Sequence, residues 1–158
     1  MQNTQQMLLF LLRVLMGWFL FYAGITKVLN PEWSAAGFLN NAKTFPEFFQ
    51  FFATPAVLPL TNFLNEWGLT LIGLALMLGV FVRLSAILGA ALMVLYYFPT
   101  LDFPYPSVHT FIVDDHVIYA VLLLYLAWVR AGRVVGLEKW LSSHPKIIAN
   151  VPTLRRLI

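Results

Sequence analysis

The sequence contains no cysteine and has few charged residues. None of its 158 residues is cysteine, and only 11% are aspartate, glutamate, lysine or arginine, whereas a typical soluble domain is about 25% charged. The absence of cysteine excludes disulfides, thiol redox chemistry and cysteine-ligated zinc or iron–sulfur centres. The length excludes a large multidomain enzyme, so we predict one domain over residues 1–158.

The sequence also lacks the motifs of common cofactor and nucleotide sites. Gly68, Gly73 and Gly79 lie within a hydrophobic stretch and do not form a dinucleotide or phosphate loop. Of the three histidines only His116 lies in a predicted span, so a haem held by two histidines is not expected. No flavin loop is evident, and residues 114–116 are too close together for a metal site. We therefore predict no haem, flavin or metal.

What the sequence has in excess is apolar residues. They make up 60% of the chain, and the mean hydropathy is +0.78. A chain this short cannot hide that surface in one core, so we expect lipid to be its solvent. Four apolar runs approach the roughly 20 residues that a helix needs to cross a bilayer, at about residues 7–29, 62–82, 84–101 and 112–130. We predict an all-α, membrane-embedded four-helix bundle.

The positive charges indicate how these spans are oriented. Seven basic residues lie between the second and third spans or at and beyond the end of the fourth: Arg83, Arg130, Arg133, Lys139, Lys146, Arg155 and Arg156. The opposite side has only Lys27 and Lys43, beside five acidic residues. We therefore expect an integral, multi-pass protein of a prokaryotic cytoplasmic membrane with both termini cytoplasmic. Its basic tail, residues 131–158, then contacts membrane lipid, and no nucleic acid partner is expected.

The two ends of the predicted bundle differ in sequence. Arg13 interrupts the first apolar run, which is poor for a cleaved signal peptide, so we expect this span to be retained. Its side chain is expected to snorkel to the interface or to fix helix register. In the tail, residues 134–141 form an amphipathic pattern with Lys139 beside Trp140. This pattern predicts a short interfacial helix.

The connection of residues 30–61 is too long to lack structure. Its first three residues, Asn-Pro-Glu, are typical of a helix N-cap, a first-position proline and a first-turn acid, and they predict a short helix through residues 33–38. Pro46 begins a second, phenylalanine-rich piece that Pro59 is expected to end. We predict that these two interfacial helices roof the bundle at the outer leaflet.

Ionisable residues within the predicted spans are few, and such residues usually face a bundle interior. Judged by helical phase and height, Lys27, Glu66 and Asp115 converge with Tyr96 or Tyr97 beneath the roof. Three interpretations remain open. The charges form a buried ion pair that fixes helix register, they line a ligand or redox pocket, or they contact lipid headgroups.

Three further side chains are assigned to this predicted site. Tyr119 shares a helix face with Asp115, Trp67 belongs to the outer aromatic belt, and His116 is hypothesised to carry protons. Because His116 lies about 100° from Asp115 around the helix, we expect only one of them to face the bundle axis. Asp114 is interpreted as a charge that stabilises the helix N-terminus.

Several short motifs resemble those of the DoxX/DoxD-like membrane proteins. The first span contains an arginine, two glycines and a lysine in RVLMGWFLFYAGITK, residues 13–27. The resemblance continues through Asn-Pro-Glu-Trp at 30–33, Asn-Glu-Trp-Gly at 65–68, Leu-Gly to Arg at 78–83 and Tyr-Tyr at 96–97. It covers roughly residues 7–135. The resemblance implies a four-helix membrane bundle.

The resemblance also implies a redox role. One branch of the family is the membrane subunit of thiosulfate:quinone oxidoreductase, and another associates with superoxide dismutase and a sulfurtransferase in oxidative-stress defence. On the first branch, Lys27 would attract an anion or stabilise a reduced quinone oxygen. Glu66 and Asp115 would exchange protons, and Tyr96 or Tyr97 would contact the quinone ring. This branch also implies a second redox subunit.

Two functions therefore follow from the sequence. The leading hypothesis is a DoxX/DoxD-like subunit that binds quinone in an outer-leaflet pocket and supports thiosulfate- or stress-linked electron transfer. The alternative is a non-enzymatic membrane scaffold or assembly partner, which the absence of any redox centre favours. A small-molecule carrier is disfavoured, because four spans without a repeat or a broken helix lack the usual features of transporters. The sequence leaves homo-oligomerisation open.

Overall fold

The computed structural model describes residues 3–144, and this part of the chain is helical without a strand. Four long helices are α1 (Asn3–Val28), α4 (Leu58–Leu78), α5 (Val82–Thr100) and α6 (Asp115–Trp128). Short helices lie at both ends of this group: α2 (Ala36–Asn40), α3 (Pro46–Phe52), the 3-10 turn η1 (Ala131–Arg133) and α7 (Leu137–Ser142). The all-α prediction is confirmed. Within the described residues, α1 and α5 are long and apolar enough to cross a membrane, and α6 is a shorter apolar helix.

The boundaries of two helices differ from the prediction for local reasons. Pro59 was expected to end the roof, but it lies in the first turn of α4, where a missing backbone N–H has no helical partner to lose. α6 begins at Asp115 instead of near residue 112. Ile112 has a φ of +60°, which no α-helical residue adopts, and Asp114 then caps the helix by accepting a hydrogen bond from the Val117 N–H.

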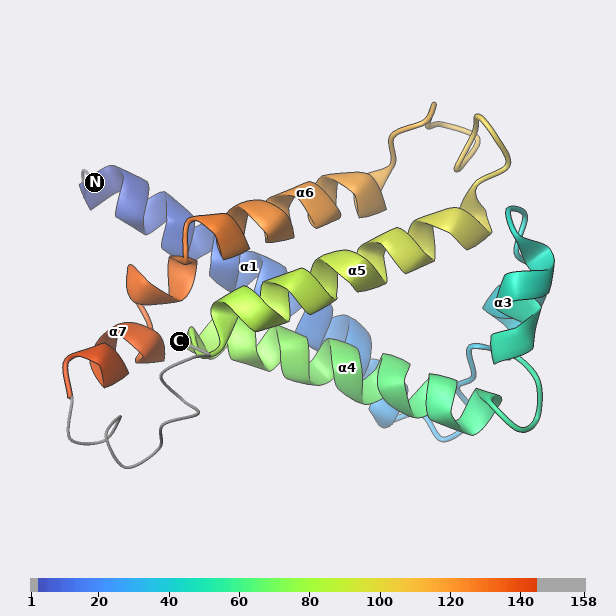
Figure 1. The fold of residues 1–158 in the computed structure, drawn as a ribbon, viewed down its shortest axis with the longest axis horizontal. Coiled ribbons are helices and arrows are strands. Elements are labelled where there is room, and N and C mark those ends of the chain that lie inside the picture. Colours follow the sequence, from blue (N-terminus) through green and yellow to red (C-terminus); the bar gives the residue numbers. More distant parts are fainter. Residues whose placement is uncertain (1–2, 145–158) are drawn as a thin grey trace.

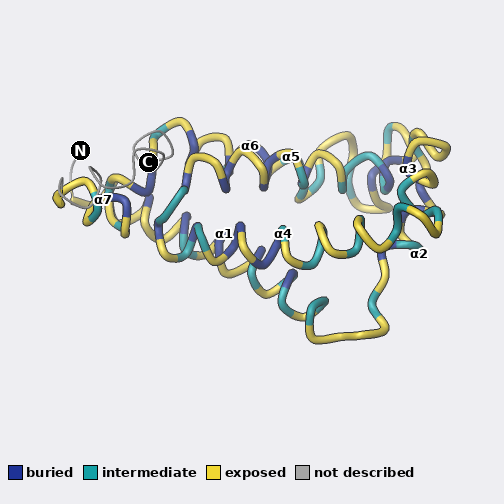
Figure 2. The backbone as a smooth tube through the Cα atoms, turned by 60° about the horizontal axis from the view of Figure 1, so that its bottom comes forward, coloured by how far each residue is buried: buried dark blue, intermediate teal, exposed yellow. Residues whose placement is uncertain are grey.

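The long helices form two layers, α1 against α4 and α5 against α6 (Figure 1). Figure 2 shows the buried residues between these layers. Leu20, Leu69, Leu76, Leu123 and Leu126 are the fully buried leucines of this core. α1 and α4 approach closely because glycines face the contact. A Cβ atom added at Gly73 would overlap the backbone of Phe21, and one at Gly24 would overlap that of Thr70. Small residues at such contacts are typical of membrane helices.

The short helices occupy opposite ends of the bundle (Figure 1). We call the end with α2, α3 and residues 101–114 the roof end, and the end with η1 and α7 the tail end. The predicted α3 is confirmed, with Pro46 in its first turn and Glu47 beside it. The first roof helix starts at Ala36, later than predicted. The Asn30 side chain caps a turn instead, since it accepts a hydrogen bond from the Glu32 N–H.

Part of the predicted tail can be compared with the structure. The short helix predicted at residues 134–141 is present as α7, but it packs back on the bundle with Glu138 buried. Lys146, Arg155 and Arg156, on which the predicted orientation partly rests, lie outside the described residues. Arg13 is 1% exposed, so it fixes helix register and does not snorkel.

Candidate functional site

A polar cavity of about 260 Å³ lies at the roof end, where the four long helices meet the segment that leads into α2. Each long helix contributes one side chain to it. Its lining comprises Lys27, Trp33, Ser34, Ala35, Phe38, Asn65, Tyr96 and His116. Three of these, Lys27, Tyr96 and His116, belong to the predicted site. The structure therefore brings together part of the predicted set.

Lys27 is held in the last turn of α1 by an amide and two aromatic rings. Its Nζ donates a hydrogen bond to Asn65 Oδ1 at 2.8 Å. The same Nζ lies 4.9 Å from the centre of the Trp33 ring and 5.5 Å from that of Tyr96. Such contacts stabilise a cation without an ion pair, and a cation is also favoured at a helix C-terminus. The cavity thus contains a positive charge that no carboxylate neutralises directly.

The predicted ion pair of Lys27 with Glu66 or Asp115 is not formed. Within the described residues the salt bridge that exists joins His116 to Asp114. Glu66 is half-buried on α4 and acts on Lys27 electrostatically, while the preceding Asn65 makes the direct contact. Asp115 is exposed in the first turn of α6. Of the two adjacent residues it is therefore His116 that faces the bundle, because Asp114 fixes where α6 begins.

Tyr96 has a buried hydroxyl group without a hydrogen-bond partner among the described residues. The Asn65 side chain lies close to it without meeting hydrogen-bond geometry. Phe38 packs edge-on against the Tyr96 ring, with ring centres 6.1 Å apart. Buried polar atoms nearly always have a partner, and leaving one unpaired costs about 1–3 kcal/mol. This unpaired hydroxyl belongs to a residue that lines the cavity.

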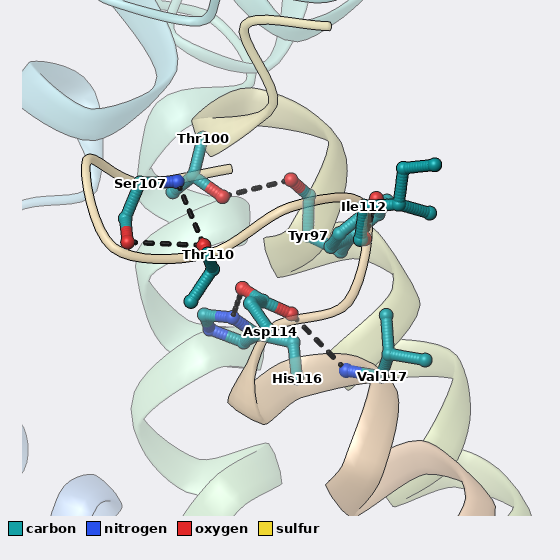
Figure 3. Close-up of polar contacts among 8 residues, drawn as sticks. All are labelled: Tyr97, Thr100, Ser107, Thr110, Ile112, Asp114, His116 and Val117. Carbon is teal, nitrogen blue, oxygen red and sulfur yellow. Dashed lines mark hydrogen bonds and ion pairs between the residues drawn. The ribbon is translucent and has the colours of Figure 1, made fainter. Parts of the chain in front are cut away.

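His116 lies beside Tyr96. Asp114 fixes its ring, as Figure 3 shows. Its Nδ1 lies 2.7 Å from Asp114 Oδ2, while Asp114 Oδ1 accepts the hydrogen bond of the Val117 N–H at 3.2 Å. The imidazole and Tyr96 rings have centres 6.1 Å apart and meet edge to face. The Asp114 side chain is 12% exposed and that of His116 31% exposed. The pair therefore connects the cavity with the molecular surface.

A second, apolar cavity of about 190 Å³ adjoins the polar one. It lies between α2 and α3 on one side and α4 and α5 on the other, and it shares Ala35, Phe38, Asn65 and Tyr96 with the polar cavity. The rest of its lining is nearly all apolar: Leu39, Phe48, Phe49, Phe52, Thr61, Leu64, Leu92 and Leu95. Tyr96 thus stands where a polar and an apolar space meet.

Three other predicted site residues lie away from both cavities. The Tyr97 hydroxyl donates a hydrogen bond to the Ile112 carbonyl, so this side chain braces residues 101–114 against α5 (Figure 3). Tyr119 packs against Phe19, with ring centres 4.8 Å apart. Trp67 is 41% exposed. Of the two adjacent tyrosines it is Tyr96 that faces the cavities.

Sequence reasoning missed two side chains of this site and one at the tail end. Asn65 lies in the Asn-Glu-Trp-Gly motif, in which the charge of Glu66 favours the neighbouring residue. Trp33 ends the Asn-Pro-Glu-Trp motif and contacts Lys27, but it was not predicted as a site residue. Glu138 is 3% exposed at the tail end, and its charge alone predicts a solvated residue. A signal for Asn65 was available in the sequence. It immediately precedes Glu66, which was expected to lie near Lys27.

Glu138 caps α5 from a distant part of the chain. Its Oε1 accepts a hydrogen bond from the Val82 N–H at 2.7 Å, and its own N–H donates to the Gly79 carbonyl at 2.9 Å. A carboxylate is favoured at a helix N-terminus. Burial raises the pKa of Glu138, while the Val82 N–H and the charges of Arg133, Arg13 and Arg130 oppose that rise. Arg13 Nη1 donates to the Ala131 carbonyl at 3.1 Å.

The DoxX family model matches residues 8–100, more than half of the chain. The chain belongs to the DoxX family. The matched residues run from α1 to the end of α5 and include Lys27, Asn65 and Tyr96. Comparison with curated proteins and with solved structures gave no match. The resemblance inferred from the motifs is thereby confirmed, and this DoxX-family protein is membrane-associated, with apolar helices suited to that setting.

Proposed function

We propose that α1, α4, α5 and α6 of this DoxX-family protein all cross the bilayer and that its roof end binds a quinone-type ligand. Large apolar side chains on the outside of every long helix support the first part. Leu15, Leu71, Leu88 and Leu124 are all exposed, and so much apolar surface is compatible with lipid and not with water. α6 has 14 residues and spans about 21 Å, so η1 and residues 101–114 complete its crossing.

The observation that carries the ligand proposal is the unpaired, buried hydroxyl of Tyr96, a residue that lines both cavities. A quinone is amphipathic, with two carbonyl oxygens on a ring and an apolar tail. The polar cavity accommodates the ring, where Tyr96 and Lys27 donate hydrogen bonds to the oxygens. The apolar cavity accommodates the first part of the tail. On reduction the oxygens gain negative charge, which Lys27 stabilises.

The surroundings of the apolar cavity provide a route for such a ligand. Leu64, Leu95 and Phe48 line it and are also exposed on the outside of the bundle. Within a bilayer these side chains contact lipid, so a quinone dissolved in the membrane reaches the cavity laterally. The tail then remains partly in lipid while the ring occupies the polar cavity.

We further propose that the bound quinone accepts electrons in a thiosulfate- or stress-linked reaction. In the thiosulfate reaction two thiosulfate ions each lose one electron and join through a new S–S bond as tetrathionate. The quinone takes up both electrons and two protons and becomes quinol. Lys27 favours the approach of the anionic donor, and a second redox subunit supplies any further electron carrier.

Equilibrium binding of a short-tailed menaquinone analogue to the protein in nanodiscs tests the ligand proposal. We expect binding by the wild type and roughly tenfold weaker binding by Tyr96→Phe, since one hydrogen bond is worth about 1 kcal/mol or somewhat more. Tyr22→Phe, which changes an exposed tyrosine on α1, is the matched control and should bind normally. A well-folded wild type that binds no quinone would disprove the proposal.

A separate assay tests the electron donor. Thiosulfate is added to nanodiscs that contain the protein and an oxidised quinone, with and without membrane extract as a source of a second subunit. We expect quinol to form and Lys27→Met to lower its rate. Normal quinone binding with no quinol under either condition would remove thiosulfate as the donor and leave quinone binding intact.

One observation favours the alternative of a non-enzymatic scaffold. Lys27 is already stabilised by Asn65 and two rings, so its charge can serve packing alone. In that case Lys27→Met combined with Asn65→Leu leaves a folded protein, whereas Asn65→Leu alone destabilises it by leaving the lysine unpaired. The scaffold also requires that quinone does not bind, so the binding assay separates the two functions.

A further inference from the structure

Asp114 uses its two carboxylate oxygens for different purposes. Oδ1 accepts the Val117 N–H and caps α6, while Oδ2 contacts His116 Nδ1. A helix cap needs only one acceptor, and asparagine caps as well as aspartate does. The contact with His116 is therefore additional to the cap, and it lies beyond the residues matched by the family model.

The contact with Asp114 determines which imidazole nitrogen is available to a ligand. With Nδ1 protonated and donating to the carboxylate, Nε2 of the neutral ring is an acceptor, and it has no partner among the described residues. A carboxylate in this position fixes both the tautomer and the orientation of a histidine ring. His116 lines the polar cavity beside Tyr96.

The groups around His116 suit the movement of a proton. Lys27 from α1 and Tyr96 from α5 line the same cavity. Glu66 from α4 acts on Lys27, and on the same helix as His116 Asp115 points to the surface. His116 is the histidine of the cavity lining, and no carboxylate belongs to that lining among residues 3–144. Histidine changes its charge between about pH 5 and 8, and this ring is partly exposed.

We propose that His116 is the proton donor and acceptor of the roof-end cavity and that Asp114 is its positioning residue. This inference rests on the proposed binding of quinone. When a reductant of the thiosulfate class has supplied two electrons to the quinone, the Nε2–H bond of protonated His116 breaks and an O–H bond forms on the quinone. The second proton comes from water, and His116 regains its own proton from water at its exposed edge.

The tautomer of His116 provides a test that needs no ligand. Nitrogen NMR of histidine-labelled protein in nanodiscs at high pH should show Nδ1 protonated and Nε2 bare in the wild type. In Asp114→Asn the amide oxygen keeps the cap, and the amide NH₂ donates to Nδ1. The proton should therefore move to Nε2. An unchanged tautomer in this variant would show that Asp114 does not position the ring.

The pH dependence of quinone binding tests the proton itself. Protonated His116 donates a hydrogen bond to a quinone oxygen, so binding of the oxidised analogue should tighten roughly tenfold from pH 8 to pH 5. His116→Gln should remove this dependence. Asp114→Asn should weaken this dependence, because the carboxylate no longer holds the ring in position. His109→Gln, at an exposed position, is the control that should behave as the wild type.

The possible results separate this inference from the function on which it rests. Quinone binding with a pH dependence that survives in His116→Gln would overturn the proton pair and leave quinone binding in place. No binding by the wild type at any pH would overturn both. Binding whose pH dependence requires His116 but not Asp114 would keep the proton donor and remove the positioning residue.

Discussion

The roof end and the tail end of this protein both bury charged groups, but they do so differently. At the tail end, Arg13 and Glu138 are 1% and 3% exposed, and each is bonded to backbone groups. At the roof end, Lys27 and His116 line a cavity with an unpaired Tyr96 hydroxyl. Two buried charges that are surrounded by protein hold helices together. Similar charges beside open space are available to a ligand.

Glycines account for part of this difference. Arg13 also has one buried nitrogen, Nε, without a partner among the described residues. At the tail end, however, Gly79 and Gly136 bring backbone against it, and a Cβ atom at either would lie within 2.8 Å of Arg13 Nη1. At the roof end, the aromatic side chains of Trp33, Phe38 and Tyr96 line the cavity instead. The unpaired Arg13 nitrogen is enclosed by backbone, whereas the unpaired Tyr96 hydroxyl belongs to a residue that lines two cavities.

The largest effect is expected from removing the charge at the tail end. Glu138→Leu leaves the Val82 N–H without its acceptor and Arg13 buried without a neighbouring carboxylate. Stranding a buried charge typically costs about 3–5 kcal/mol, so the free energy of unfolding in mixed micelles should fall by that order. Glu138→Gln keeps an acceptor oxygen and should lose much less. Equal losses in both variants would contradict this account.

A smaller effect is expected from Gly79→Ala. Gly79 has a φ of +70°, and an added Cβ would lie 2.7 Å from Arg13 Nη1 and 2.8 Å from the Gly136 Cα. Alanine in this conformation costs about 1 kcal/mol, and displacing Arg13 adds to that cost. Thermal unfolding should show the loss. Gly37→Ala is the matched control, because nothing lies within 4 Å of its added Cβ, and it should not destabilise the protein.

At the roof end Tyr96→Phe should have little effect on stability. The hydroxyl makes no hydrogen bond with the described residues, so its removal leaves no partner unpaired and relieves a buried polar group. The unfolding free energy should stay equal or rise by up to about 1 kcal/mol, while quinone binding weakens. A loss of stability equal to that of Glu138→Leu would erase the contrast between the two ends.

The smallest effect concerns pH and the tail end. The pKa of Glu138 is raised in the folded protein, so the folded state binds a proton more readily than the unfolded state. Glu138 therefore makes stability greater at low pH and less as pH rises through its folded pKa. The unfolding free energy of the wild type, relative to that of Glu138→Gln, should therefore decrease as the pH rises from 4 to 8. A difference that grows in favour of the wild type with rising pH would show that the pKa is lowered instead.

The sequence predicted the long helices and the level of the roof-end site because both depend on local pattern. Apolar runs locate the helices, and the positions of Lys27 and Tyr96 near helix ends set their height. The choice between Asp115 and His116 depended on one detail, the start of α6 after Asp114. A helix start is determined by a cap and by a positive φ at Ile112, which hydropathy does not reveal.

The tail end was beyond sequence reasoning for a different reason. Glu138 and Val82 are far apart in the chain, and nothing in either segment indicates that they meet. In the sequence, Glu138 belongs to an amphipathic pattern, and this pattern predicts that its carboxylate is exposed to solvent. Its burial requires the close approach of Gly79 and Gly132, which only the three-dimensional arrangement supplies. Long-range polar contacts of this kind leave no periodic signal.

The bonding of Arg13 has a consequence for the order in which the protein is made. A ribosome synthesises Arg13 early, but its partner Ala131 and the nearby Glu138 appear only near the end of the described chain. Until then α1 carries a guanidinium group whose native partners do not yet exist. The nascent protein must therefore keep this group hydrated or bound to lipid phosphate, and the tail end closes only after α7 has been translated. A chain that ends before α7 would already contain Ala131 but would lack Glu138, the buried carboxylate whose charge acts on Arg13.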